Sequence, residues 1–176
     1  MSEFSFATAA LKTGVPFGIF MGFYQGMASH PPSVAVGLIA GTASGVLFGG
    51  TMALFMRSQH KKAAVVRDEL SAEGLLFDAA ANLGAKGGWL FLTKQRLVFV
   101  PHKLNIGATR VELAVKTIAA LRDNSGLRAR ALDVGSVSES GATQQHSFVV
   151  QKRDEWMKHI TDAVTSAGGH VKTATT

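Results

Sequence analysis

The sequence predicts an α+β protein: a two-helix transmembrane hairpin, then a small, strongly bent antiparallel sheet of seven strands capped by a C-terminal helix. Three observations predict this class. Apolar segments without charge fill the first third of the 176 residues, short strand-like runs follow from residue 75, and a helical apolar stripe lies near the end. We expect a hairpin over 1–56, a basic juxtamembrane linker or helix over 57–71, a sheet domain over 72–167 and a flexible tail over 168–176.

Glycine recurs at every fourth position in both apolar segments. A glycine in a helix costs roughly 1 kcal/mol relative to alanine, so something must compensate for so many. In a bilayer the backbone is forced into helix, and small residues let two helices approach closely. We therefore predict that the two rows pack against each other within one hairpin, and a glycine-mediated homo-oligomer or pore is the alternative. The rows are Gly14, Gly18, Gly22 and Gly26, and Gly37, Gly41, Gly45 and Gly49.

The two apolar segments differ in length. Residues 33–56 carry no charge and exceed the roughly 20 apolar residues that cross a bilayer. Residues 13–29 are shorter and follow Lys12, so this segment spans fully only if the lysine side chain extends to the headgroups. Prolines at 31 and 32 predict a tight turn between antiparallel helices. A soluble, buried hairpin is the alternative.

Basic residues set the predicted orientation. They cluster directly after the second segment, whereas the turn between the segments has no Lys or Arg, so both termini and the sheet domain should be cytoplasmic. The N-terminus has no pattern of a cleaved signal peptide. We expect a basic surface near the membrane, attracted to anionic lipid by about 1 kcal/mol per charge, with simple solvation of these side chains as the alternative. Its predicted members are Arg57, Lys61, Lys62, Arg67, Lys94 and Arg96.

Strand signals fill the middle of the chain. Alternation and turn residues predict seven short strands, and the stretch 135–145 is predicted as a long turn. A helix should follow residue 151, because Trp156, Ile160 and Val164 fall on one face and acidic residues occupy the first turn. The predicted strands are 75–83, 89–93, 96–101, 110–115, 118–122, 127–134 and 146–151.

One stretch resembles a known family. Residues 88–100, GWLFLTKQRLVFV, are similar to the central hairpin of GRAM domains, which have the pleckstrin-homology-like fold. Ile118 and the run from Phe148 into Trp156 look like later landmarks of that family, so the resemblance covers about 72–167. It implies a domain that is not an enzyme and that binds phosphoinositides, other membrane lipids or protein partners.

The resemblance also implies where a ligand would lie. In pleckstrin-homology-like sheets that bind inositol phosphates, the ligand sits among the loops at the open end. In this chain those loops offer Lys86, His102 and Lys103. Lys94 and Arg96 are too far along the strand to share one headgroup with Lys86, at about 3.3 Å per residue.

Other function classes find little support in the sequence. Cysteine is absent, and the six histidines lack the spacing that places two metal ligands on one element. No nucleophile elbow or Walker loop occurs, so we expect no catalytic residue, metal or cofactor. The net charge of +6 is scattered among acidic residues, which argues against nucleic acid. Anionic lipids are the predicted partners, and the alternative is binding of protein alone through a sheet edge or the 135–145 loop.

Overall fold

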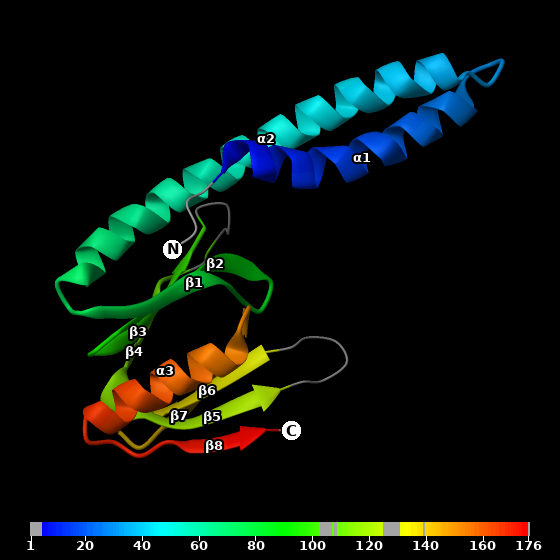
Figure 1. The fold of residues 1–176 in the computed structure, drawn as a ribbon. Coiled ribbons are helices and arrows are strands. Elements are labelled where there is room, and N and C mark those ends of the chain that lie inside the picture. The colour runs from blue at the N-terminus through cyan, green and yellow to red at the C-terminus, as the bar shows by residue number, and fades with distance from the viewer. Residues whose placement is uncertain (1–4, 103–106, 108, 125–130, 139, 176) are drawn as a thin grey trace. The chain divides into compact units, whose positions relative to one another are not determined.

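The computed structural model describes residues 5–102, 107, 109–124, 131–138 and 140–175 (Figure 1). The chain divides into two compact units, Met1–Ala64 and Val65–Thr176. The first holds the helical hairpin, and the second holds the sheet together with the end of the second helix.

The hairpin consists of helix α1 (Phe6–Ala28) and the first part of helix α2 (Val34–Ser71). Both helices are long and apolar enough to cross a membrane. Helix α2 has 38 residues, but about 20 suffice for a hydrocarbon core of roughly 30 Å. The helix therefore continues past its apolar part and includes the basic segment 57–71.

The two glycine rows face each other across the hairpin. A Cβ atom placed on Gly41 would lie only 2.6 Å from the carbonyl oxygen of Gly18 and 2.9 Å from Cα of Gly22. A Cβ on Gly22 would lie 2.8 Å from the oxygen of Gly37. All eight glycines meet the opposing backbone in this way. Packing within one chain therefore accounts for both rows.

The second unit contains a mixed sheet of eight strands in the order β4-β3-β2-β1-β7-β6-β5-β8. All neighbouring strands are antiparallel except β5 and β8. The elements are β1 (Leu75–Leu83), β2 (Lys86–Thr93), β3 (Arg96–Pro101), β4 (Val111–Ala114), the 3-10 turn η1 (Val115–Thr117), β5 (Ile118–Asn124), β6 (Ala131–Val137), β7 (Thr143–Val150), α3 (Arg153–Ser166) and β8 (Lys172–Thr175).

Helix α3 closes the core of the sheet. Its buried face carries Trp156, Ile160, Ala163 and Val164, and these join the inward-facing residues of the strands in one cluster. The Trp156 ring meets the Phe77 ring of β1 edge-on, with the centroids 4.8 Å apart. The fold is thus the predicted pleckstrin-homology-like architecture, a bent sheet capped by a C-terminal helix.

Several details differ from the sequence prediction. Strand β2 begins at Lys86, three residues before the predicted start, so Lys86 lies in a strand rather than in a loop. The tail 168–176 was expected to be flexible, but residues 172–175 add an eighth strand parallel to β5, so the sheet is mixed rather than purely antiparallel. The predicted turn 135–145 is shorter, because β6 and β7 extend into it and pair as far as Val137 and Thr143. Part of the predicted strand 127–134 lies outside the described residues.

The end of helix α2 covers the outer face of the first strands. Phe91 and Val98 are opposite each other on β2 and β3, fully buried yet outside the main core. Leu70 of α2 is also fully buried. Arg67 is ion-paired to Asp78, which lies beside Phe91 in the register, so the last turns of α2 are held on this face. Both faces of this part of the sheet are therefore covered.

Candidate functional site

The open end of the sheet is formed by three loops that the strand register brings together. The β1–β2 turn is a two-residue hairpin closed by the pair Leu83 and Lys86. Strand β3 ends opposite Gly88, so the β3–β4 loop leaves from the same end. Strand β7 pairs with β1 at Phe148 and Leu83, and its earlier residues lead into the β6–β7 turn beyond that point. This end of the sheet is called the mouth below.

Lys86 and His102 lie at the mouth. Lys86 is exposed at the start of β2, and the His102 backbone N–H donates to the carbonyl oxygen of Gly87 at 2.9 Å. The His102 ring packs over Gly87, where a Cβ would lie 3.2 Å from its Cδ2 and 3.2 Å from Oδ1 of Asn82. Glycine at this position thus lets the imidazole sit close to the strand. Lys103, the third predicted ligand contact, lies outside the described residues.

His146 is a mouth residue that the sequence did not single out. Its ring stacks on Phe148 with the centroids 6.2 Å apart, on the side of β7 that faces the core. Its Nε2 atom is buried and has no hydrogen-bond partner within the described parts of the chain. Burial lowers the pKa of His146, because the charged imidazolium loses its hydration.

The mouth therefore combines the exposed ammonium of Lys86 with the partly buried imidazoles of His102 and His146. An ammonium group offers three hydrogen-bond donors and a positive charge to a phosphate. This chemistry suits a single small anionic group.

His146 makes the stability of this unit depend on pH. Its folded-state pKa is below the ordinary value of 6.5, so the unfolded chain binds the proton more readily. The sheet domain should therefore keep its full stability above pH 6.5. Below that value its free energy of unfolding should fall progressively, because the unfolded chain takes up a proton at His146. His146→Phe should remove this part of the loss between pH 7 and pH 5. Urea unfolding at several pH values measures it, with His170→Phe, an exposed histidine, as the control. Parallel pH profiles for the wild type and His146→Phe contradict the prediction.

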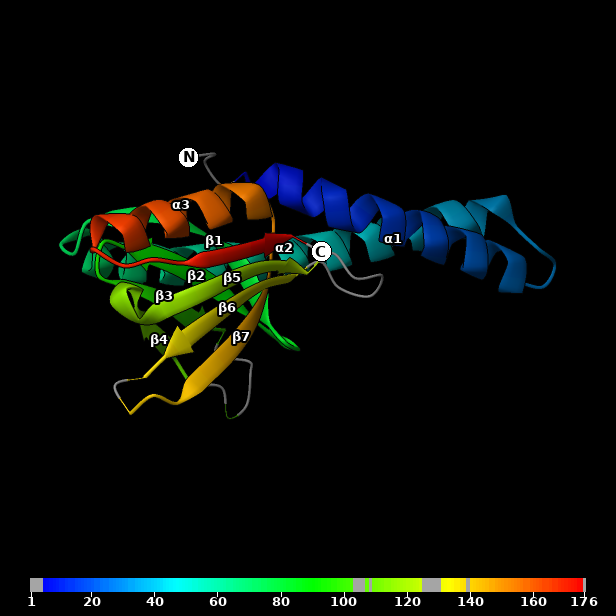
Figure 2. The same ribbon diagram turned by 90° about the horizontal axis from the view of Figure 1, so that it is seen from below.

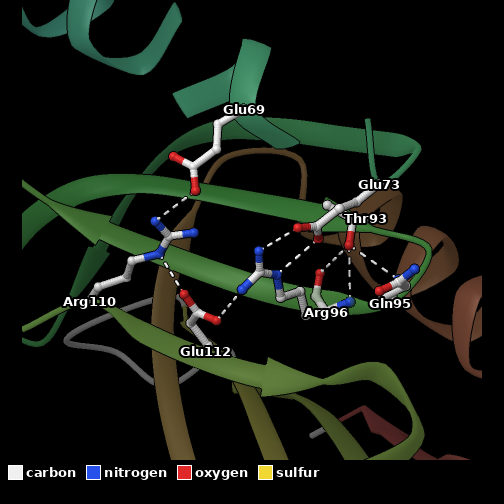
Figure 3. A network of polar contacts seen from close by, with 7 residues as sticks. All are labelled: Glu69, Glu73, Thr93, Gln95, Arg96, Arg110 and Glu112. Carbon is white, nitrogen blue, oxygen red and sulfur yellow. Dashed lines mark hydrogen bonds and ion pairs between the residues drawn. The ribbon is translucent and has the colours of Figure 1, made fainter. Parts of the chain in front are cut away.

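Two of the six predicted membrane-surface cations are held in ion pairs. Arg96 of β3 donates from Nε to Glu73 at 2.9 Å and also pairs with Glu112 of β4 (Figure 3). Arg110 extends this network, from Nε to Glu112 at 2.6 Å and from Nη1 to Glu69 of α2 at 3.3 Å. Arg67 pairs with Asp78, as described above. These contacts tie α2 and the segment after it to β1, β3 and β4.

The network shifts the pKa values of its members. The hydrogen bond to Glu73 raises the pKa of Arg96, and the bond to Asp78 raises that of Arg67. The hydrogen bond from Arg96 lowers the pKa of Glu73. Each shift favours the charged form, so the pairs persist across the physiological pH range.

The other predicted surface cations lie on two elements. Arg57, Lys61 and Lys62 are exposed on α2, and Lys94 is exposed in the β2–β3 turn. Thr93 organises that turn, because its hydroxyl accepts from the backbone N–H groups of Gln95 and Arg96 at 3.1 and 3.0 Å (Figure 3). Lys94 lies at the other end of the sheet from the mouth, because the whole of β2, from Lys86 to Thr93, separates the two ends. The membrane-surface role of all six residues stays a prediction.

The described residues contain no group of three or more His, Asp or Glu side chains placed to hold a metal ion. The carboxylate of Asp133, on the outer face of the sheet, is hydrogen-bonded within the domain. Asp133 accepts from Ser147 Oγ at 2.6 Å and from Gln145 Nε2 at 3.3 Å.

No protein-family model and no curated protein matches the chain. Among solved structures, it is similar to the hSac2 domain from the human phosphoinositide phosphatase Sac2. The sequence identity is 7% over 67% of this chain and 89% of that chain, with a TM-score of 0.49. It is also similar to the C-terminal domain of an unknown protein from Leishmania infantum, at 19% identity over 58% of this chain and 97% of that chain, with a TM-score of 0.44.

A third similar structure is that of the PDZ-RhoGEF DH/PH domains in complex with GTP-gamma-S activated RhoA. The identity is 11% over 89% of this chain and 54% of that chain, with a TM-score of 0.46. The strand order and the position of α3 show the pleckstrin-homology-like fold.

Proposed function

We propose that this protein is a membrane-anchored binding module. In this proposal the hairpin of α1 and α2 holds a pleckstrin-homology-like domain of the GRAM type at the cytoplasmic surface, where the mouth recognises an anionic lipid headgroup. The domain performs no catalysis. Its task is to bring a membrane lipid and the anchored chain together.

The observation that carries the anchoring is the apolar outer surface of the hairpin. Phe23 is 73% exposed and Ile39 is 73% exposed, and large apolar side chains are exposed along both helices. Such a surface is costly in water, at about 25 cal/mol per Å², and is covered without cost by lipid tails. The glycines pack against each other inside the hairpin, so the large apolar side chains on its outside remain to contact the bilayer.

The lipid proposal is supported by the charge at the mouth and by the basic segment beside the membrane helix. Lys86 offers a positive charge and three hydrogen-bond donors to a phosphate, and His102 lies at the same end of the sheet. Arg57, Lys61 and Lys62 follow the apolar part of α2, where cytoplasmic positive charge is favoured. The anionic cytoplasmic leaflet is the surface that suits both.

Binding to vesicles tests the lipid part. The unit Val65–Thr176 should float with vesicles containing anionic lipid and not with neutral vesicles at low salt. Lys86→Ala should weaken this partitioning about fivefold, which corresponds to about 1 kcal/mol for one charge near the surface. Lys158→Ala, an exposed lysine on α3, is the matched control and should change it less.

Equal recovery with neutral and anionic vesicles would sink the lipid proposal. Equal losses for Lys86→Ala and Lys158→Ala would remove the mouth as its site. The anchor is tested separately, because the full chain should sediment with membranes and resist extraction by alkaline carbonate. Release into the supernatant contradicts the transmembrane hairpin.

A further inference from the structure

Strand β8 is attached to the sheet differently from every other described strand. It pairs in parallel with β5 over four residues, from Lys172 opposite Ala120 to Thr175 opposite Asp123. It lies at the edge of the sheet, so only one of its sides is paired (Figure 2). Parallel pairing is slightly less stable per residue than antiparallel pairing.

Few side chains hold β8 in place. Lys172, Thr173 and Ala174 are exposed, and only Val171, just before the strand, packs against the core. The strand follows the end of α3 through Gly168, which has a φ of +78°, and Gly169. The attachment therefore depends on main-chain hydrogen bonds and one apolar contact. Segments with so few buried contacts open at low cost in free energy.

Strand β5 beneath it is an open edge once β8 leaves. Its inner residue Leu121 is buried in the core and fixes the strand, so the edge keeps its shape without β8. An uncovered edge presents a row of unpaired N–H and C=O groups, which is a template for an added strand. The β5 edge is thus a preformed peptide-binding surface that the chain covers with its own segment.

The register shows which peptide would fit better than β8. The Val171 position needs an apolar side chain, because it contacts the core. Ala174 lies beside Arg122 on the outer face, where Arg122 is exposed. Asp133 lies opposite Arg122 on the β6 side, and its carboxylate accepts from Ser147 and Gln145. An acidic residue at the Ala174 position would pair with that guanidinium, an attraction that the chain's own segment lacks.

We propose that the β5 edge is a strand-addition site for an extended segment of a partner protein, which displaces β8. The segment runs parallel to β5, with an aliphatic residue at the Val171 position and an acidic residue three positions later. This site is separate from the mouth, so it gives the anchored domain a protein partner as well as a lipid. Strand β8 covers the edge until that partner arrives.

Labelled peptides test the site on the full chain in detergent. The probes are the 170–176 sequence, the same peptide with Ala174→Glu, and one with Val171→Asp. The receptor has its own β8 disabled by Thr173→Pro with Ala174→Pro. In a strand, the backbone N–H groups of alternate residues point toward the same neighbouring strand. One of two adjacent prolines therefore removes an N–H group that would donate to β5. Thr173→Ser with Ala174→Ser is the matched control and should behave as the wild type.

The Ala174→Glu peptide should bind the double-proline variant saturably, about two- to fivefold tighter than the unchanged peptide. Raising the salt concentration should remove that gain. The wild type should bind at least about tenfold more weakly, because its own β8 competes from within the chain. The Val171→Asp peptide should bind poorly. Equal binding of all three peptides, or equal binding to wild type and variant, overturns the proposal.

Hydrogen exchange on the wild-type chain gives a second test that does not depend on the folding of the proline variant. Amides of 172–175 should exchange faster than those of β6 and β7, and faster still with the Ala174→Glu peptide in excess. Protection of β8 equal to that of β6, unchanged by the peptide, shows that the edge is permanently closed.

Discussion

Replacing Gly41 with leucine should force α1 and α2 apart. A Cβ alone at this position would lie 2.6 Å from the carbonyl oxygen of Gly18, and that atom belongs to a helix backbone that cannot rotate away. The helices must separate along the whole contact, since their glycine rows touch at four levels. We expect the hairpin to lose about 3 kcal/mol of packing free energy or more, which is the upper end of the usual cost of overpacking.

Crosslinking measures this separation. The chain has no cysteine, so a pair introduced at Phe17 and Phe48, whose rings stack with centroids 4.3 Å apart, reports the distance between the helices. Gly50→Leu is the matched control, because a Cβ at Gly50 meets no atom within 4 Å. The crosslink should be lost in Gly41→Leu and kept in Gly50→Leu. Equal yields in the two variants contradict the packing described here.

The same samples test the oligomer alternative. Crosslinks between chains in detergent should be the same for wild type and Gly50→Leu. If such crosslinks occur and disappear only in Gly41→Leu, the glycine rows also support assembly, directly or through the hairpin.

Leu70→Ala should destabilise the sheet domain by about 3 kcal/mol, within the 2–5 kcal/mol usual for a buried leucine. Leu70 is fully buried although it belongs to the last turn of α2, and the ion pairs of Arg67 and Glu69 hold this turn on the sheet. Truncation leaves a cavity over the outer face of β2 and β3. Urea unfolding of a fragment that starts at Arg57 measures the change.

Val65→Ala is the matched control for Leu70→Ala. Val65 is on the same helical segment and is 68% exposed, so its truncation should change the free energy of unfolding by less than about 0.5 kcal/mol. If Leu70→Ala costs no more than Val65→Ala, the end of α2 is not part of the domain. If the prediction holds, a fragment that begins at residue 72 should be less stable than one that begins at Arg57, because it lacks Leu70 and the end of α2.

Local signals located most of the elements. Strands β1 and β3 begin and end where the pattern predicts, because turn residues bound both runs. Helix α3 follows from its apolar period and acidic first turn, and Trp156, Ile160 and Val164 of the predicted stripe are buried. Strand β8 was missed because Lys172–Thr175 carries no alternation of its own, and a pairing with β5 some 50 residues earlier leaves no local trace.

The candidate site was predictable only in part. The positions of Lys86, at the start of β2, and of His102, just after β3, follow from a hairpin and its neighbour, which are local features. His146 joins them through the pairing of β7 with β1, which links residues far apart in sequence. Arg96 was predicted as a membrane-facing cation, but its partner Glu73 is 23 positions away and Glu112 is 16 positions away. Charge counting along the chain does not reveal such pairs.

The sequence by itself determined the class of this protein. Absence of charge, glycine spacing and the order of strands and helix are local properties, and they specify an apolar hairpin followed by a sheet that needs a cap. Tertiary structure decided which charges neutralise each other, that the end of α2 covers the sheet, and that β5 has a strand over its edge. These depend on contacts between distant residues, whose loop-closure entropy and burial are settled only when the whole domain folds.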